Sequence, residues 1–168
     1  MTFLTGISSF CFLASYVLTF ALELLRLFFR WTTIHTVALT LAMAGFFAHS
    51  VYLWLRIQAA LPSNWHLWCL VVAWVLAVLY LLFAIFRPQA PVGLFMLPLV
   101  ILVGLVAGPF TDAPGFPREQ AQTFWGIVHG TALLFGTVIV MLGFVAGVMY
   151  LVQSYRLKHK LPPSEGLR

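Results

Sequence analysis

Five long apolar segments constrain this chain more strongly than any other feature of its sequence. About 20 consecutive apolar residues are enough for a helix to cross the hydrocarbon core of a bilayer. Hydrophobic residues make up 62% of the chain and charged residues 8%, with a mean hydropathy of +1.02, so the bilayer is the solvent for most of it. The sequence therefore predicts an all-α, polytopic membrane helix bundle with about five transmembrane helices, at residues 5–25, 33–55, 66–86, 91–109 and 124–153.

The connections between these segments are short and contain residues that end helices. Arg87-Pro-Gln-Ala-Pro91 separates the third segment from the fourth, and a loop with several prolines and glycines follows at residues 108–119. Proline disfavours a continuous helix because it lacks the backbone N–H and clashes with the preceding turn. No separate soluble domain fits between the segments, so we expect one transmembrane domain over residues 1–160 and a cytoplasmic tail or connector over residues 161–168.

Basic residues at the ends of the apolar segments indicate the orientation. With the C-terminus in the cytoplasm, seven of the nine Lys and Arg residues lie inside, and Arg56 and Arg118 lie outside. Because cytoplasmic loops carry the excess of Lys and Arg, we expect the N-terminus outside and the C-terminus in the cytoplasm of a multi-pass protein of the cell inner (plasma) membrane. The first segment has no basic start and no cleavage site, so we expect it to be retained. The basic residues form no stripe, which argues against a nucleic-acid partner.

The fifth segment carries a histidine on a face of small residues. His129, Gly136 and Gly143 are seven residues apart and Gly147 follows one turn later, so they share one face of a helix. Small residues mark the side of a membrane helix that packs closely on another helix. A polar side chain on such a face is a candidate for function.

The second segment repeats this pattern. Small residues and two histidines follow three- and four-residue steps along one face: His35, Ala38, Ala42, Gly45 and His49. In the predicted topology His49 and His129 lie at similar depths in the outer leaflet, and His66 joins them from the outer start of the third segment. Neutral imidazole is a favoured axial ligand of haem iron. We therefore expect His129 and His49 as axial ligands of a haem b and His66 as a further cofactor-binding residue, whereas His35 lies at the inner end, too far away.

Other readings of these residues remain open. A histidine inside a membrane also serves as a hydrogen-bonding group between helices, worth about 0.6 kcal/mol. We expect Glu23 to join a charged cluster with Arg26 and Arg30 rather than to carry protons. No nucleophile–base pair, carboxylate pair or phosphate-binding loop is present, so we expect no enzyme. Cys11 and Cys69 are too few for a disulfide framework.

The fifth segment resembles a helix of a known family. The run His129-x6-Gly136-x6-Gly-Phe-Val-Ala-Gly147-Val-Met-Tyr-Leu, followed by Leu157-Lys-x-Lys160, is similar to the first histidine-bearing helix of the cytochrome c assembly family. The stretch from Trp65 to Tyr80 and the stretch Gly93-Leu-Phe-Met-Leu-Pro98 are similar to the pair of helices that precedes it. The family contains haem-handling proteins of c-type cytochrome maturation and a shorter branch linked to haem biosynthesis.

The resemblance implies a membrane component that binds or conveys haem toward the outer face, with His129 as an external axial ligand. Its partners would be other cytochrome c assembly membrane subunits and, indirectly, apocytochrome c. The family's tryptophan-rich signature, WGxxWxWD, is absent. It would follow the point where this chain stops. The resemblance therefore implies either a fragment or split half, whose site is completed by a partner chain that carries the motif, or a member of a shorter lineage.

Two further functions remain open at this stage. One is a non-catalytic accessory subunit that regulates haem biosynthesis or docks partner helices through its glycine faces. The other is a haem b electron carrier in which His49 and His129 hold one haem.

Overall fold

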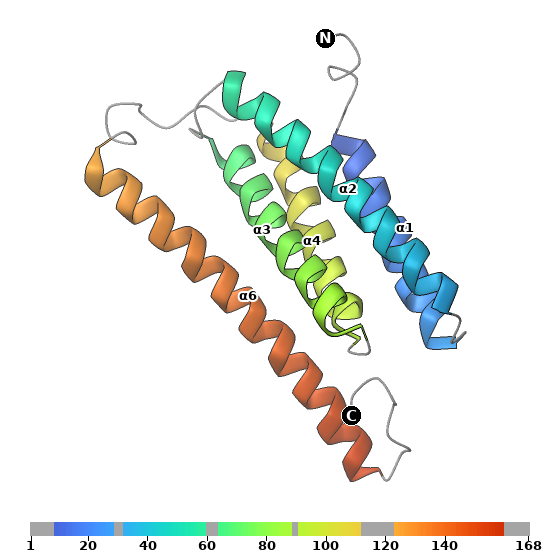
Figure 1. Ribbon diagram of the computed structural model, residues 1–168. Helices are drawn as coiled ribbons and strands as arrows, with labels where there is room; N and C mark the ends of the chain where they lie inside the picture. The colour runs from blue at the N-terminus through green and yellow to red at the C-terminus, as the bar shows by residue number, and fades with distance from the viewer. Residues whose placement is uncertain (1–8, 29–31, 60–63, 89–90, 112–122, 160–168) are drawn as a thin grey trace.

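The chain folds into helices throughout the part that the structure describes. The structure is a computed structural model, and it describes residues 9–28, 32–59, 64–88, 91–111 and 123–159. In these ranges it contains no strand, and its elements are α1 (Ser9–Phe28), α2 (Thr32–Ala59), α3 (Trp65–Phe86), α4 (Val92–Ala107), the short 3-10 helix η2 (Gly108–Phe110) and α6 (Phe124–Lys158), with the labels of Figure 1. The predicted all-α fold is confirmed.

Four of these helices are long and apolar enough to cross a membrane. They are α2, α3, α4 together with η2, and α6. The chain is thus a polytopic membrane helix bundle, whereas the crossing by the 20-residue α1 stays a prediction, as do the orientation of the termini and the identity of the membrane. The predicted ranges agree with the observed helices except at their ends: α2 continues to Ala59 and α6 to Lys158, because a helix persists beyond the apolar run that identifies it.

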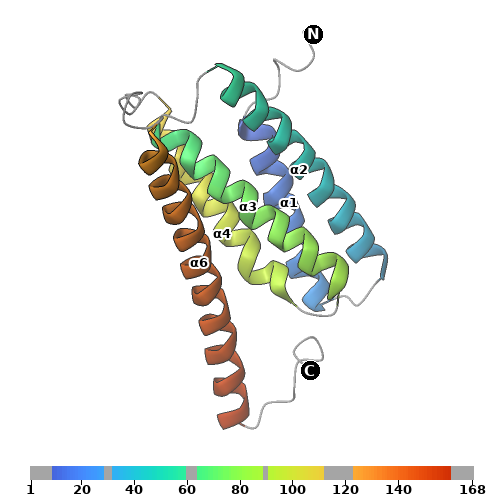
Figure 2. The same ribbon diagram turned by 60° about the vertical axis from the view of Figure 1, so that its left-hand side comes forward.

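Helices α1 to α4 form a four-helix body in which each helix packs on two neighbours. The strongest pairs are α1 with α2 and α3 with α4, and the ring is closed by α1 against α4 and α2 against α3. Helix α6 lies outside this ring beside α3 and α4, and in both views it extends past their lower ends (Figures 1 and 2). We call the end with the starts of α3 and α6 the upper end of the molecule.

Small residues let the helices of the body approach closely. A side-chain carbon added at Gly45 of α2 would lie 2.7 Å from Ser15 Cβ of α1, and one at Gly104 of α4 would lie 2.7 Å from Leu13 Cδ2. Ala38 and Ala42, on the same face of α2 as Gly45, are completely buried. In a membrane, where apolar surface gains little by burial against other helices, such close packing is a main source of helix association.

A charged cluster joins α1, α2 and α3 at the lower end of the body. Glu23 is 7% exposed, and its carboxylate accepts hydrogen bonds from Arg26 (3.2 Å) and from the hydroxyl of Tyr80 (3.3 Å). Arg26 also donates to His35 Nδ1 (3.2 Å) and to the carbonyl of Pro88. The predicted pairing of Glu23 with Arg26 is confirmed, and Arg30 lies outside the described residues.

Candidate functional site

Helix α6 buries one narrow stripe and leaves the rest of its surface open. Val138 and Val145, two turns apart, are its fully buried residues, and Leu134, Met141 and Leu142 beside them are half-buried. At about 100° per residue, His129 lies about 180° around the helix from Val138. His129 is exposed. The predicted site histidine of α6 thus faces away from the body.

The glycines that share this face are open as well. A side-chain carbon added at Gly136, Gly143 or Gly147 would meet nothing within 4 Å. The sequence predicted that this face packs on another helix, and within the described residues of this chain no helix covers it.

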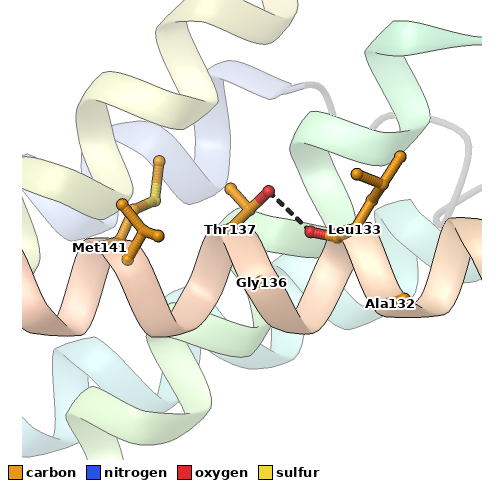
Figure 3. Close-up of a pocket in the computed structure, with 6 residues that line it drawn as sticks. Ala132, Leu133, Gly136, Thr137 and Met141 are labelled. Carbon is orange, nitrogen blue, oxygen red and sulfur yellow. Dashed lines mark hydrogen bonds between the residues drawn. The ribbon is translucent and has the colours of Figure 1, made fainter.

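A shallow groove of about 410 Å³ runs along the same part of α6. Its lining residues all come from this helix: Ala132, Leu133, Gly136, Thr137, Val140 and Met141 (Figure 3). The Thr137 hydroxyl donates to the carbonyl of Leu133 (2.8 Å), so its polar group is already used within the helix. The groove therefore offers an apolar surface beside Gly136, two turns below His129.

His49 has the opposite environment. Its side chain is completely buried, its ring stacks on Phe12 with centroids 4.2 Å apart, and its Nδ1 lies 3.3 Å from the hydroxyl of Tyr16. Its Nε2 is buried and makes no hydrogen bond within the described residues. This histidine therefore joins α1 and α2 inside the body, and a ligand would reach it only if these helices separated.

His66 is also enclosed. It is 4% exposed at the start of α3, where Asn64 caps the helix by accepting from the backbone N–H of Leu67 (3.0 Å). Its Nδ1 donates to the carbonyl of Ala107 at the end of α4 (2.8 Å). Because a carbonyl only accepts, Nδ1 carries a proton. The buried Nε2 makes no hydrogen bond in the described part of the chain.

The structure does not bring the predicted ligands together. His49 lies inside the body against α1, His66 faces the end of α4, and His129 lies on the outer side of α6. Among the described residues no group of three or more His, Cys, Asp or Glu side chains has the arrangement of a metal site. His35 belongs to the charged cluster at the lower end. His129 is the predicted ligand that is open to a cofactor from outside the chain.

The sequence does not reveal the buried partners of His49 and Glu23. Tyr16, whose hydroxyl faces His49, is 33 residues away from it in the chain, and Tyr80, which donates to Glu23, is 57 residues away from that residue. One signal was available: Tyr16, Thr19 and Glu23 follow helical spacing on one face of α1, and all three are buried. Polar residues at this spacing in an apolar helix indicate a face that meets other helices.

Comparison of the chain with protein-family models, with curated proteins and with solved structures found no match.

Proposed function

We propose that this protein is an integral membrane component of cytochrome c assembly that binds or conveys haem b through His129. The observation that supports this most directly is the exposed imidazole of His129 on a face of α6 whose glycines have nothing packed on them. A haem is a flat, largely apolar disc held by an axial imidazole. The glycines on this face give such a disc room to lie close to the backbone.

The position of His129 along α6 suits transfer at a membrane surface. His129 follows the first residue of the helix, Phe124, by five residues, which is about 8 Å along the axis. A haem held there lies close to the upper boundary of the bilayer, within reach of a protein outside it. In the predicted topology this boundary is the outer one, where apocytochrome c would receive haem.

The second axial ligand would come from another protein chain. His49 does not fit this role because it is enclosed by Phe12 and Tyr16. His66 does not fit it because its side chain is 4% exposed and Nε2, the ring nitrogen left by the bond from Nδ1 to Ala107, is buried. This arrangement disfavours the electron carrier in which His49 and His129 share one haem. It favours a subunit that offers one ligand on an open face, to be completed by a membrane subunit with the tryptophan-rich motif.

Haem binding by variants of the purified protein tests the proposal. Protein expressed with haem supplementation should show a Soret band, and His129→Ala should weaken haem binding at least about tenfold, because loss of an axial ligand removes more than about 1.4 kcal/mol. His159→Ala is the matched control, since His159 is an exposed histidine at the other end of the same helix. A colourless wild-type protein, or equal binding by both variants, would contradict the proposal.

A second candidate function is a non-catalytic subunit that docks partner helices of haem biosynthesis or cytochrome assembly. The same open glycines favour it, because Gly143 and Gly147 lie well below His129 and no haem at His129 would cover them. Under this function Gly143→Leu abolishes the complex with the partner, whereas His129→Leu leaves it intact. Pull-down of the native complex from membranes, with the two variants compared side by side, separates this function from haem handling.

A further inference from the structure

Gly130 of helix α6 is not open, in contrast to Gly136, Gly143 and Gly147. A side-chain carbon added at Gly130 would lie 3.1 Å from both Cη2 and Cζ2 of Trp68, which belongs to the first turn of α3. This separation is shorter than an ordinary carbon–carbon contact of about 3.5–4.0 Å. The rim of the Trp68 indole is therefore so close that a side chain at position 130 would have to displace the indole or α6 by at least a few tenths of an ångström.

This contact is adjacent to the proposed haem ligand. Gly130 follows His129 directly, and successive residues of a helix point about 100° apart. When Trp68 rests on the backbone of α6 at Gly130, the direction of His129 is fixed as well. The ring and the imidazole then lie on different sides of α6, which agrees with the exposed position of His129.

The turn that carries Trp68 is itself held in place. Asn64 caps α3, and His66 donates from Nδ1 to the carbonyl of Ala107 at the end of α4. The first turn of α3 is thus tied to α4 on one side and rests on α6 on the other. Because α6 buries few other residues, this contact at its upper end has a large share in fixing its rotation.

We propose that Trp68 is a positioning residue for His129: its ring fills the gap at Gly130 and sets the rotation of α6 so that the imidazole faces outward. The rotation of α6 by Trp68 does not depend on haem, whereas the ligation of haem by the positioned His129 rests on the proposed function. The two parts can therefore fail separately.

Spin labels test the rotation without haem. In a background with Cys11→Ser and Cys69→Ala, nitroxides at the exposed positions Phe47→Cys in α2 and Ile139→Cys in α6 report the distance between the body and α6. Gly130→Val should shift the main distance by about 2 Å or more, as expected for a displaced helix. Gly147→Val is the matched control, because nothing lies within 4 Å of a side-chain carbon there, and its distances should equal those of the parent.

Compensation separates positioning from general damage to the fold. Trp68→Leu removes the ring that the new side chain meets, so Gly130→Val combined with Trp68→Leu should return the main distance toward that of the parent. An unchanged distance in Gly130→Val, or no return in the double variant, would overturn the proposal.

The haem spectrum then tests the link to His129. In haem-loaded protein, Gly130→Val should shift the low-temperature EPR g values of the haem because the axial imidazole turns, and Gly147→Val should leave them unchanged. Equal g values in parent and Gly130→Val would overturn the positioning of His129. If the parent protein binds no haem, the proposed function fails, while the distances still decide whether Trp68 sets the rotation.

Discussion

The glycines of the body and three glycines of α6, Gly136, Gly143 and Gly147, have the same chemistry and opposite surroundings. At Gly45, Gly93 and Gly104 an added side-chain carbon would lie 2.7–2.9 Å from an atom of a neighbouring helix, whereas Gly136 and Gly143 have empty space in front of them. The histidines show the same contrast, since His49 is enclosed and His129 is exposed. In the body, small residues lie where neighbouring helices pack closely on each other. On α6, residues of the same type form a surface on which no described helix packs.

The largest difference in the free energy of unfolding should appear between a leucine at a closely packed glycine of the body and a leucine at an open glycine of α6. Gly45→Leu forces α1 and α2 apart at Ser15, and overpacking of this kind costs about 3 kcal/mol. Gly143→Leu adds a side chain to an open face and should change the stability of the isolated chain by less than about 0.5 kcal/mol. Denaturant-induced unfolding in detergent micelles, followed by circular dichroism, measures both. Equal losses would show that the face of α6 is covered within the chain.

The charged cluster at the lower end offers a second test of the body. Arg26→Leu leaves the buried carboxylate of Glu23 without its cation and should destabilise the body by about 2 kcal/mol. The cost stays below that of a fully buried pair because a quarter of the Arg26 side chain is exposed. Arg156→Leu, at the lower end of α6, is the control in the same unfolding measurement. A loss for Arg156→Leu as large as that for Arg26→Leu would mean that α6 and the body unfold as one unit.

The two histidines should separate stability from haem binding. His49→Leu removes the stacking on Phe12 and leaves the Tyr16 hydroxyl unpaired, which should cost about 1–2 kcal/mol. His129→Leu should leave stability unchanged and remove haem binding. Unfolding curves measure the stability of both variants, and haem titrations measure their affinity for haem. If His49→Leu removes haem binding while the protein stays folded, the enclosed histidine of the body and the exposed histidine of α6 do not have separate roles.

The smallest effect should come from a neutral hydrogen bond inside the body. Trp74 donates from Nε1 to Ser50 Oγ (2.9 Å), and Trp74→Phe removes the donor while it keeps an aromatic ring against Phe46. Hydrogen bonds between membrane helices average about 0.6 kcal/mol, so this is the expected loss. The double variant Trp74→Phe with Ser50→Ala should cost little more than the single one, and a clearly larger cost would mean that Ser50 has another role.

The sequence alone predicts where the helices lie in the chain, but it does not predict which helices pack against each other. Apolar length alone predicts α3 and α4 to within a few residues, because any segment that crosses a bilayer must bond its own backbone. The rule of small residues applies to Gly45 and to Gly136 alike, and it cannot say whether the second helix lies in the same chain. Pairing of Tyr16 with His49 depends on how α1 and α2 are rotated, which local spacing does not determine.

The isolation of α6 also has a consequence for the order of folding. Two fully buried valines, Val138 and Val145, fix a helix of 35 residues to the body. Helices α1 to α4 are made first, and they can complete their close contacts before α6 leaves the insertion machinery. We therefore expect the backbone amides of α1 to α4 to exchange with deuterium as one slow cooperative unit and those of α6 to exchange earlier and independently. Of the long helices that the structure describes, α6 is therefore the least costly to move.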